Sequence, residues 1–323
     1  MTAVTASTVT VPIAVEDGIL AEIRRGLGSR PLALPSKLFY DDVGSELFDR
    51  ICDLPEYYPT RTELALLEEK AAEIAALSDA DELVELGSGT GRKTRTLLEA
   101  MLEREIRVRY VPVDISDYAL LAAVGLEDDY PGLEVEGVRC DYTRDLDELP
   151  VSERMLCAFL GGTVGNFAAD EAIRVLREVA ERLPLGSWFL LGVDLVKPVR
   201  VLEAAYNDSR GVTAAFNRNI LEVVNREADG DLDPADFDHL ARFNAAESRI
   251  EMHLVARRPV RAVLERLDLV LEMAAGESIL TEISRKFTRT TTAALLARSG
   301  FDLRHWFPAP DDAFALALAA VEG

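Results

Sequence analysis

The sequence predicts an α/β fold with one mostly parallel sheet and a second, smaller α+β domain. Three observations support this. Short apolar runs alternate with helical patterns between residues 82 and 194. A glycine-rich turn, within ELGSGTGRKT, follows the first of these runs. From Lys197 onward the alternation stops, and a different mixture of helical and strand-like segments begins. Strands that alternate with helices form parallel sheets with helices on both faces.

The alternating part of the chain supplies the elements of the sheet in order. Strands are expected near 82–86, 108–113, 134–138, 154–160 and 188–194. Helices are expected near 60–77, 94–104, 116–125, 168–183 and 290–299. The chain ends in two apolar runs, FDLRHWF and AFALALA, which we expect to complete the sheet as an antiparallel hairpin.

The stretch from 197 to 286 reads as an insertion. Its helical patterns lie near 199–207, 212–227 and 234–243, and its strand-like runs near 247–257, 261–272 and 279–287. We therefore expect a Rossmann-like domain made of residues 60–196 plus 287–323. A substrate-binding domain of residues 16–59 plus 197–286 would accompany it, and residues 1–15 would form an N-terminal arm.

Composition excludes several classes of protein. The net charge of −22 repels phosphate backbones, so we expect no nucleic-acid partner. No apolar run approaches the roughly 20 residues that span a membrane, and the N-terminus lacks the basic region of a secretory signal. The three cysteines form no CxxC pair, which suits a reducing compartment. These features favour a cytoplasmic protein, which we expect to act as a monomer.

Three nucleotide-binding motifs contain a glycine-rich turn of this kind, and the residues of the turn distinguish between them. The dinucleotide fingerprint and the phosphate loop both require glycine at position 92, where the chain has Arg92. The E/D-x-G-x-G motif of methyltransferases that use S-adenosylmethionine is satisfied by Glu85, Gly87 and Gly89. Glycines at these positions let the backbone turn tightly and approach a cofactor without Cβ clashes. The turn therefore favours S-adenosylmethionine.

Two further acids follow in the expected order. Asp114 ends the second strand, where a carboxylate accepts the ribose hydroxyls, and Asp141 with Tyr142 ends the third, beside the adenine. The carboxyl ends of parallel strands meet at one edge of the sheet, so these groups should converge. The histidines at 239, 253 and 305 lack the spacing of metal ligands, and we expect no metal.

The loop after the fourth strand, LGGTVGNF, carries Asn166. Its amide can both donate and accept hydrogen bonds at the cofactor edge. The alternative is a local cap at the start of the next helix. The residue types alone leave both roles open.

Five stretches, taken together, resemble one family. They are FYDDVGSELFDRICDLPEYYPTRTE, FLGGTVGNF, GVTAAFNRNILEVVNRE, RIEMHL and GESILTEISRKF. The chain is similar, from about residue 16 to its end, to the histidine-specific Nα-methyltransferases that begin ergothioneine biosynthesis. The resemblance implies three methyl transfers from S-adenosylmethionine to the α-amine of L-histidine. The products would be hercynine and S-adenosylhomocysteine.

The resemblance also implies roles around the amino-acid part of the substrate. Asn166 and Tyr206 would hold the carboxylate, and Tyr40 would lie near the amine and the cofactor. Tyr40 and Asn166 are thus the candidate catalytic residues, as orienting groups. Gly161 and Thr163 would form the substrate-side loop.

Other residues would read the imidazole ring. The resemblance implies that Tyr57 reaches it through water, that Glu282 and Ser284 clamp its nitrogens, and that Met252 packs against it. Alternate residues of a strand share a face, so Glu282 and Ser284 should point the same way. The cofactor contacts that it implies are Gly87, Lys93, Asp114 and Asp141.

Two alternatives stay open at this stage. A methyltransferase for another amino acid, such as tryptophan, would use the same scaffold but should replace Glu282 and Met252. A non-catalytic protein with the same fold should have lost the glycine turn or Asp114. The chain keeps all of these features.

Overall fold

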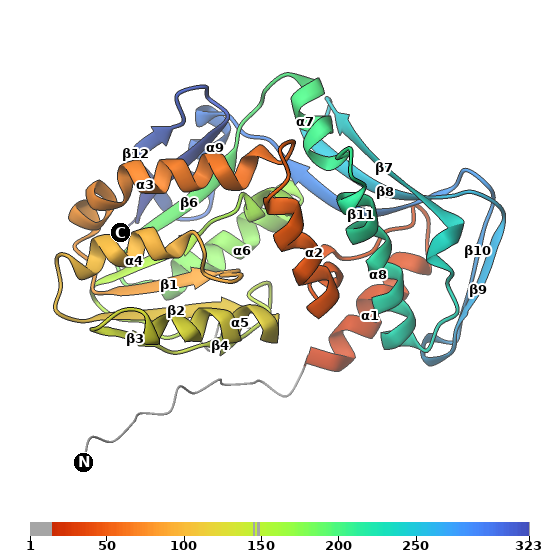
Figure 1. Ribbon diagram of the computed structural model, residues 1–323, viewed down its shortest axis with the longest axis horizontal. Helices are drawn as coiled ribbons and strands as arrows, with labels where there is room; N and C mark the ends of the chain where they lie inside the picture. Colours follow the sequence, from red (N-terminus) through yellow and green to blue (C-terminus); the bar gives the residue numbers. More distant parts are fainter. Residues whose placement is uncertain (1–14, 145, 147–148, 323) are drawn as a thin grey trace, which may run out of the picture. The chain divides into compact units, whose positions relative to one another are not determined.

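A computed structural model describes residues 15–144, 146 and 149–322 (Figure 1). The predicted arm comprises residues 1–15, and its first 14 residues lie outside the described part of the chain. Its last residue, Val15, begins helix α1 (Val15–Leu27). The chain divides into two compact units. The first comprises Pro59–Val196 and the chain from Phe287 onward. The second comprises the N-terminal segment that ends at Tyr58, together with Lys197–Lys286.

The first unit is built on one eight-stranded sheet. Its strands are β1 (Glu82–Leu86), β2 (Val108–Asp114), β3 (Leu133–Val135), β4 (Val138–Arg139), β5 (Met155–Phe159), β6 (Trp188–Asp194), β12 (Phe301–Pro308) and β13 (Phe314–Val321). They lie in the order β12-β13-β6-β5-β1-β2-β3, with β4 paired to β2. Strands β1 to β6 pair in parallel, whereas β13 is antiparallel to both β6 and β12. The parallel sheet and its terminal hairpin were both predicted correctly.

Burial on both faces explains the composition of the central strands. Every residue of β1 and of β5 is buried, as expected for parallel strands covered by helices. The long helices of this unit are α3 (Tyr58–Ser78), α4 (Thr94–Leu102), α5 (Asp117–Val124), α6 (Ala169–Arg182) and α9 (Arg289–Arg298). Within the described residues, none of the helices has the length and apolar character needed to cross a membrane.

The second unit pairs helices with a smaller antiparallel sheet. Its strands β7 (Phe237–Asn244), β8 (Arg249–Ala256) and β11 (Ser278–Arg285) lie in the order β11-β8-β7. A separate hairpin joins β9 (Val260–Leu264) to β10 (Leu269–Met273). The helices after α1 are α2 (Asp42–Cys52), α7 (Val199–Tyr206) and α8 (Val212–Ala228). Figure 1 shows α8 lying along the strands, and it also packs against α2.

Two expectations for the second unit were wrong. The predicted helix at 234–243 is a 3₁₀ turn, Pro234–Asp236, followed by β7. Phe237 and Ala241 are buried while the residues between them alternate in exposure, so pairing with β8 overrides the helical spacing. The predicted strand at 261–272 is divided by a 3₁₀ turn at Glu265–Leu267.

Candidate active site

The glycine turn after β1 has the open geometry that a cofactor requires. Gly87 and Gly89 have φ values of +67° and +53°, which side chains rarely adopt. The amide of Gly87 donates to the carbonyl of Val113 at 2.7 Å, which ties the turn to β2. A Cβ at Gly89 would meet no atom within 4 Å, so space lies over the backbone there.

Asp114 at the end of β2 is joined to this turn. One carboxylate oxygen accepts from the amide of Gly89 at 2.9 Å, and the other accepts from the amide of Ser116 at 2.9 Å. Burial raises the pKa of Asp114 above its ordinary value, against the lowering effect of these bonds. A carboxylate has about four acceptor positions, so capacity remains for two hydroxyls of a ligand.

Asp141 and Tyr142 follow β4, the neighbour of β2. Asp141 is buried, and its carboxylate accepts from the Thr143 hydroxyl at 2.6 Å. The ring of Tyr142 packs edge-on against Phe159, with 5.4 Å between ring centroids. A Cβ at Gly87 would meet the Tyr142 hydroxyl at 3.5 Å. The structure therefore brings Gly87, Asp114 and Tyr142 together, as the strand-end argument predicted.

Glu85 lies beneath the turn rather than at its surface. It is 2% exposed, and one carboxylate oxygen accepts from the hydroxyls of Thr94 and Tyr110, each at 2.6 Å. Burial raises its pKa to about 7, although both hydrogen bonds and the charge of Lys93 lower it. These contacts tie β1, β2 and α4 together. A direct bond from Glu85 to the cofactor stays a prediction.

Lys93 contacts a residue that the sequence did not single out. Its ammonium forms an ion pair with Glu63 of α3. Glu63 is fully buried, and it accepts from the amide of Gly161 at 2.8 Å. Gly192 makes room for this carboxylate, because a Cβ there would lie 2.1 Å from a Glu63 oxygen. One signal in the sequence could have revealed Glu63: it lies three residues before Leu66, and this spacing places it on the apolar face of the helix.

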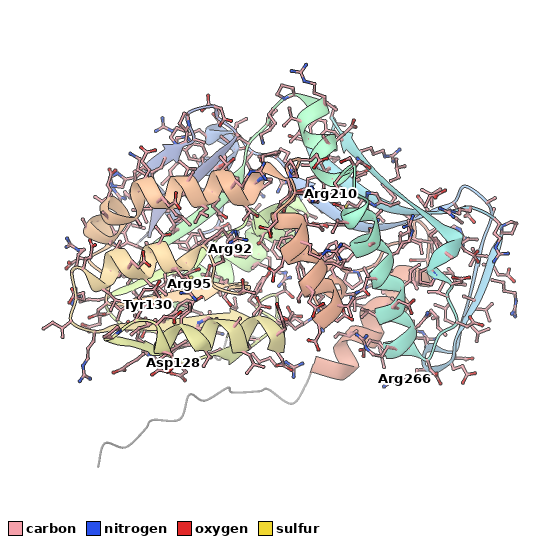
Figure 2. The ribbon with its side chains drawn as sticks, viewed as in Figure 1. Arg92, Arg95, Asp128, Tyr130, Arg210 and Arg266 are labelled. Carbon is pink, nitrogen blue, oxygen red and sulfur yellow. The ribbon has the colours of Figure 1, made fainter. Side chains whose placement is uncertain are left out.

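The start of α4 carries further basic side chains. Figure 2 labels Arg92, which precedes this helix, and Arg95, which lies beside Tyr130. The guanidinium of Arg95 pairs with Asp129 at 2.8 Å and lies 5.8 Å from the centroid of the Tyr130 ring. These contacts attach α4 to the segment that follows α5. Arg92 is exposed at the position where the two rejected nucleotide motifs need glycine.

The loop after β5 presents the substrate-side residues of the first unit. Gly161 has a φ of +78°, and the loop then forms a 3₁₀ turn, Thr163–Asn166. The Thr163 hydroxyl donates to the carbonyl of Leu160 at 2.9 Å. Asn166 ends the turn, and within the described residues its side-chain amide forms no hydrogen bond. The capping role that the sequence left open is therefore not seen.

In the second unit, three tyrosines belong to one aromatic cluster. The rings of Tyr57 and Tyr206 meet edge-on, with 6.2 Å between centroids. Phe48 of α2 packs edge-on against both Tyr57 and Tyr40, at 6.2 Å and 5.8 Å. Tyr40 also contacts Phe216 of α8. Burial, followed by the nearby Tyr206, raises the pKa of Tyr57 well above its ordinary value.

Glu282 and Met252 lie directly opposite each other on β11 and β8. A β-bulge between Leu280 and Glu282 interrupts the strict alternation that the sequence predicted. The intervening residue, Thr281, is buried and donates to the side-chain oxygen of Asn217 at 2.6 Å. Because of the bulge, the direction of the Glu282 side chain does not follow from the alternation of the residues before it.

The carboxylate of the half-buried Glu282 differs from the buried acids Glu63, Glu85 and Asp141. Burial raises its pKa to about 7, and the charge of Lys286 lowers it. It accepts no hydrogen bond from the part of the chain that the structure describes. Two residues further along β11, the Ser284 hydroxyl accepts from the Tyr206 hydroxyl at 2.8 Å. The structure thus brings Met252, Glu282, Ser284 and Tyr206 together.

Tyr206 is held from its backbone side by a partly buried chain of polar groups. The Nε2 of His239 lies 2.8 Å from the Tyr206 carbonyl, and its Nδ1 lies 2.9 Å from the side-chain nitrogen of Asn217. A carbonyl only accepts and an amide nitrogen only donates, so His239 is neutral with its proton on Nε2. Burial also lowers the pKa of His239.

Comparison with known proteins decides the family. The model of the family described as "Histidine-specific methyltransferase, SAM-dependent" matches residues 19–321. The chain belongs to this family. The histidine N-alpha-methyltransferase of Mycolicibacterium smegmatis is 46% identical over 94% of this chain and 95% of its own. That of Mycobacterium tuberculosis is 45% identical over 93% and 94%.

A solved structure agrees with the fold. The CcbJ methyltransferase from Streptomyces caelestis superposes with a TM-score of 0.50 at 15% identity, covering 88% of this chain and 98% of its own. As a member of the histidine-specific methyltransferases, the chain depends on S-adenosylmethionine. The open glycine turn and the Asp114 carboxylate fit that cofactor.

Proposed function

We propose that this protein transfers three methyl groups from S-adenosylmethionine to the α-amine of L-histidine. The product is hercynine, formed in the first step of ergothioneine biosynthesis. One observation carries the proposal beyond the family: the carboxylate of Glu282 and the hydroxyl of Ser284 lie on β11 beside the buried side chain of Met252. A carboxylate and a hydroxyl can bond the two nitrogens of an imidazole, and a thioether packs against its ring.

In this proposal the first unit binds the cofactor. Asp114 accepts the ribose hydroxyls, Asp141 and Tyr142 lie at the adenine, and Lys93 makes a further cofactor contact. The turn at Gly87 and Gly89 lets the backbone approach closely. S-adenosylmethionine supplies a methyl group that is already activated as a sulfonium.

The protein contributes to the reaction mainly by alignment. An in-line displacement needs the lone pair of a neutral amine, and well-oriented encounters are worth roughly 7–11 kcal/mol. The α-amine of a peptide has a pKa of about 8, so amines of this kind have a neutral fraction without a dedicated strong base. Asn166 and Tyr206 then hold the substrate carboxylate, and Tyr40 orients the amine. Gly161 and Thr163 shape the loop beside it.

Three rounds of transfer require a site that accepts a quaternary ammonium. Such a group forms no hydrogen bond, but an aromatic face attracts it. The tyrosines of the aromatic cluster supply such faces, and Tyr57 in this proposal also reaches the ring through water. Accumulation of the trimethylated product is therefore expected.

A mass measurement tests the proposal. The protein is incubated with excess S-adenosylmethionine and each of the twenty amino acids. We expect histidine alone to gain three methyl groups, and Nα-methyl- and Nα,Nα-dimethylhistidine to be substrates as well. A product that stops at one added methyl would contradict trimethylation. Methylation of tryptophan in place of histidine would favour the alternative substrate.

The remaining partners are also proposed. We infer that the protein acts as a monomer in the cytoplasm, without a metal and without nucleic acid. The net charge of −22 supports the absence of a nucleic-acid partner, and the three cysteines, which form no disulfide within the described residues, suit a reducing compartment. Light scattering tests the oligomeric state, and activity in the presence of a chelator tests the metal.

A further inference from the structure

Asn217 is a buried residue of α8 whose side chain contacts all three strands of the small sheet in the second unit. It is 0% exposed. Its side-chain nitrogen lies 3.0 Å from the carbonyl of His253 on β8 and 2.9 Å from the Nδ1 of His239 on β7. Its side-chain oxygen lies 2.6 Å from the hydroxyl of Thr281 on β11. The proposed function gives this residue no role.

The donors and acceptors of these contacts follow from the groups involved. The carbonyl of His253 only accepts, so the NH2 group of Asn217 faces it and donates. The second hydrogen of this NH2 group goes to Nδ1 of His239, which must be unprotonated. The Asn217 oxygen only accepts, so the Thr281 hydroxyl donates its single hydrogen there. The carbonyl of Met252, 3.1 Å from that hydroxyl, does not receive it. Each of these hydrogens is therefore used once.

On one side the amide of Asn217 acts on Tyr206. Because Nδ1 of His239 accepts, the ring proton is on Nε2, which donates to the Tyr206 carbonyl at 2.8 Å. Tyr206 is the last residue of α7, and the proposed function places the substrate carboxylate on its side chain. Asn217 thus fixes the tautomer of His239 and, through it, the end of α7.

On the other side the amide of Asn217 acts on the β-bulge before Glu282. Thr281 is the residue within this bulge, and it is 1% exposed. A bulge leaves its extra residue outside the regular ladder and bends the strand, so it can redirect a neighbouring side chain. The hydrogen bond from Thr281 to Asn217 ties the bulge to α8. The direction of the Glu282 side chain therefore depends on a bond that α8 provides.

We propose that Asn217 is a positioning residue for histidine binding. It acts through His239 on Tyr206, and through Thr281 on Glu282, so that one amide sets the spacing between the groups for the two ends of the substrate. This inference rests on the proposed function, because it assumes that Tyr206 holds the carboxylate and that Glu282 binds the ring. All of its contacts lie in the second unit, so it should set the affinity for histidine without setting that for the cofactor.

Calorimetry on the whole protein tests this role. Histidine is titrated into protein saturated with S-adenosylhomocysteine, so that no turnover occurs, and S-adenosylhomocysteine is titrated separately. Asn217→Leu keeps a similar size and removes all three hydrogen bonds. It should bind histidine about tenfold or more weakly, and S-adenosylhomocysteine within about twofold of the wild type. A folded variant with wild-type histidine affinity, or with equal losses for both ligands, would overturn the inference.

Asn225→Leu is the matched control. Asn225 lies eight residues further along α8, and its amide also joins the helix to a neighbouring backbone. It donates to the carbonyl of Leu232 at 2.7 Å and accepts from the amide of Leu232 at 2.9 Å. This variant should lose stability in urea denaturation but keep its histidine affinity within about twofold. A loss of affinity as large as that of Asn217→Leu would reduce Asn217 to a general structural role and overturn the inference.

Substitutions of Thr281 test the contact with the bulge, and they decide the question if Asn217→Leu does not fold. Thr281→Ser keeps the hydroxyl and should bind histidine as the wild type does. Thr281→Val keeps the shape but lacks the donor, and should bind histidine about threefold to tenfold more weakly. In the Glu282→Ala background the same change should cost less than about twofold, because the side chain that the bulge directs is gone.

The outcomes distinguish the inference from the proposed function. Wild-type histidine affinity in Thr281→Val, or an undiminished effect of this change in the Glu282→Ala background, would overturn the inference and leave the proposed function standing. A wild-type protein that neither binds nor methylates histidine would instead refute the proposed function itself.

Discussion

Two glutamates, the buried Glu85 and the half-buried Glu282, show how similar electrostatics can serve different purposes. Burial raises the pKa of each to about 7. Glu85 accepts hydrogen bonds from Thr94 and Tyr110, both at 2.6 Å. Glu282 accepts none from the described residues, and the only opposing influence on its pKa is the charge of Lys286. Glu282 is half-buried, and a partly desolvated carboxylate without donors is less stable than one in water.

The difference separates a structural acid from one that is prepared for a ligand. The donors of Glu85 come from elements of its own unit, so its bonds hold the base of the glycine turn. Glu282 lacks such donors, and a ligand N–H would supply one. A raised pKa alone does not distinguish the two cases, whereas the hydrogen-bond partners do.

The largest expected effect comes from Glu85. Replacing it with alanine leaves the buried hydroxyls of Thr94 and Tyr110 without an acceptor, at about 1–3 kcal/mol each. We expect the free energy of unfolding to fall by about 2–6 kcal/mol, as measured by urea denaturation. Glu85→Gln, which keeps an acceptor oxygen, should lose less than half as much. An alanine variant as stable as the wild type would refute the structural role.

The opposite pattern is expected for Glu282. Glu282→Ala should weaken histidine binding by about 1–3 kcal/mol, or roughly tenfold to several-hundredfold, because the ring N–H loses its acceptor. Its free energy of unfolding should not decrease. Calorimetry with S-adenosylhomocysteine present measures the affinity. The matched control is Glu277→Ala, which removes an exposed ion pair with Arg30 and should leave histidine binding unchanged. Unchanged histidine binding in the Glu282 variant would show that other residues bind the imidazole ring.

In its hydrogen bonding Asp114 is intermediate between Glu85 and Glu282, since it accepts two hydrogen bonds from backbone amides and retains capacity for a ligand. Asp114→Ala should weaken S-adenosylmethionine binding by about 1–3 kcal/mol. The exposed Asp117, three residues further on, provides a control whose alanine variant should bind normally. A folded Asp114 variant with wild-type cofactor affinity, measured by calorimetry, would exclude the ribose contact.

The smallest effect concerns the pH dependence of stability. The folded-state pKa of Glu282, about 7, lies above its ordinary value of 4.5. The wild type therefore loses stability through this group as the pH rises from 4.5 to 7, and Glu282→Gln does not. The variant should gain about 1–2 kcal/mol relative to the wild type between pH 5 and pH 8, after discounting for solvent. Urea denaturation at both pH values measures this gain. If the wild type and the variant differ in free energy of unfolding by the same amount at pH 5 and pH 8, burial does not raise the pKa of Glu282.

The sequence by itself determined the first unit in considerable detail. The apolar runs of β1, β2 and β6 and the glycine turn are local patterns, and the structure places them where the patterns predicted. Parallel strands end at one edge of the sheet, so the order of the acids along the chain was enough to bring Asp114 to the turn. Local signals suffice where the connections are regular.

Tertiary structure decided what local signals did not show. The helical spacing at 234–243 became strand β7 because β8 offers it a partner. The bulge before Glu282 arises from pairing with β8, and no property of LTEIS alone predicts it. Lys286 continues the alternation of Glu282 and Ser284, yet its contact with Tyr206, 80 residues earlier, exists only in the folded chain. Burial and the choice of hydrogen-bond partner depend on neighbours that are distant in sequence, and these two quantities distinguish Glu85 from Glu282.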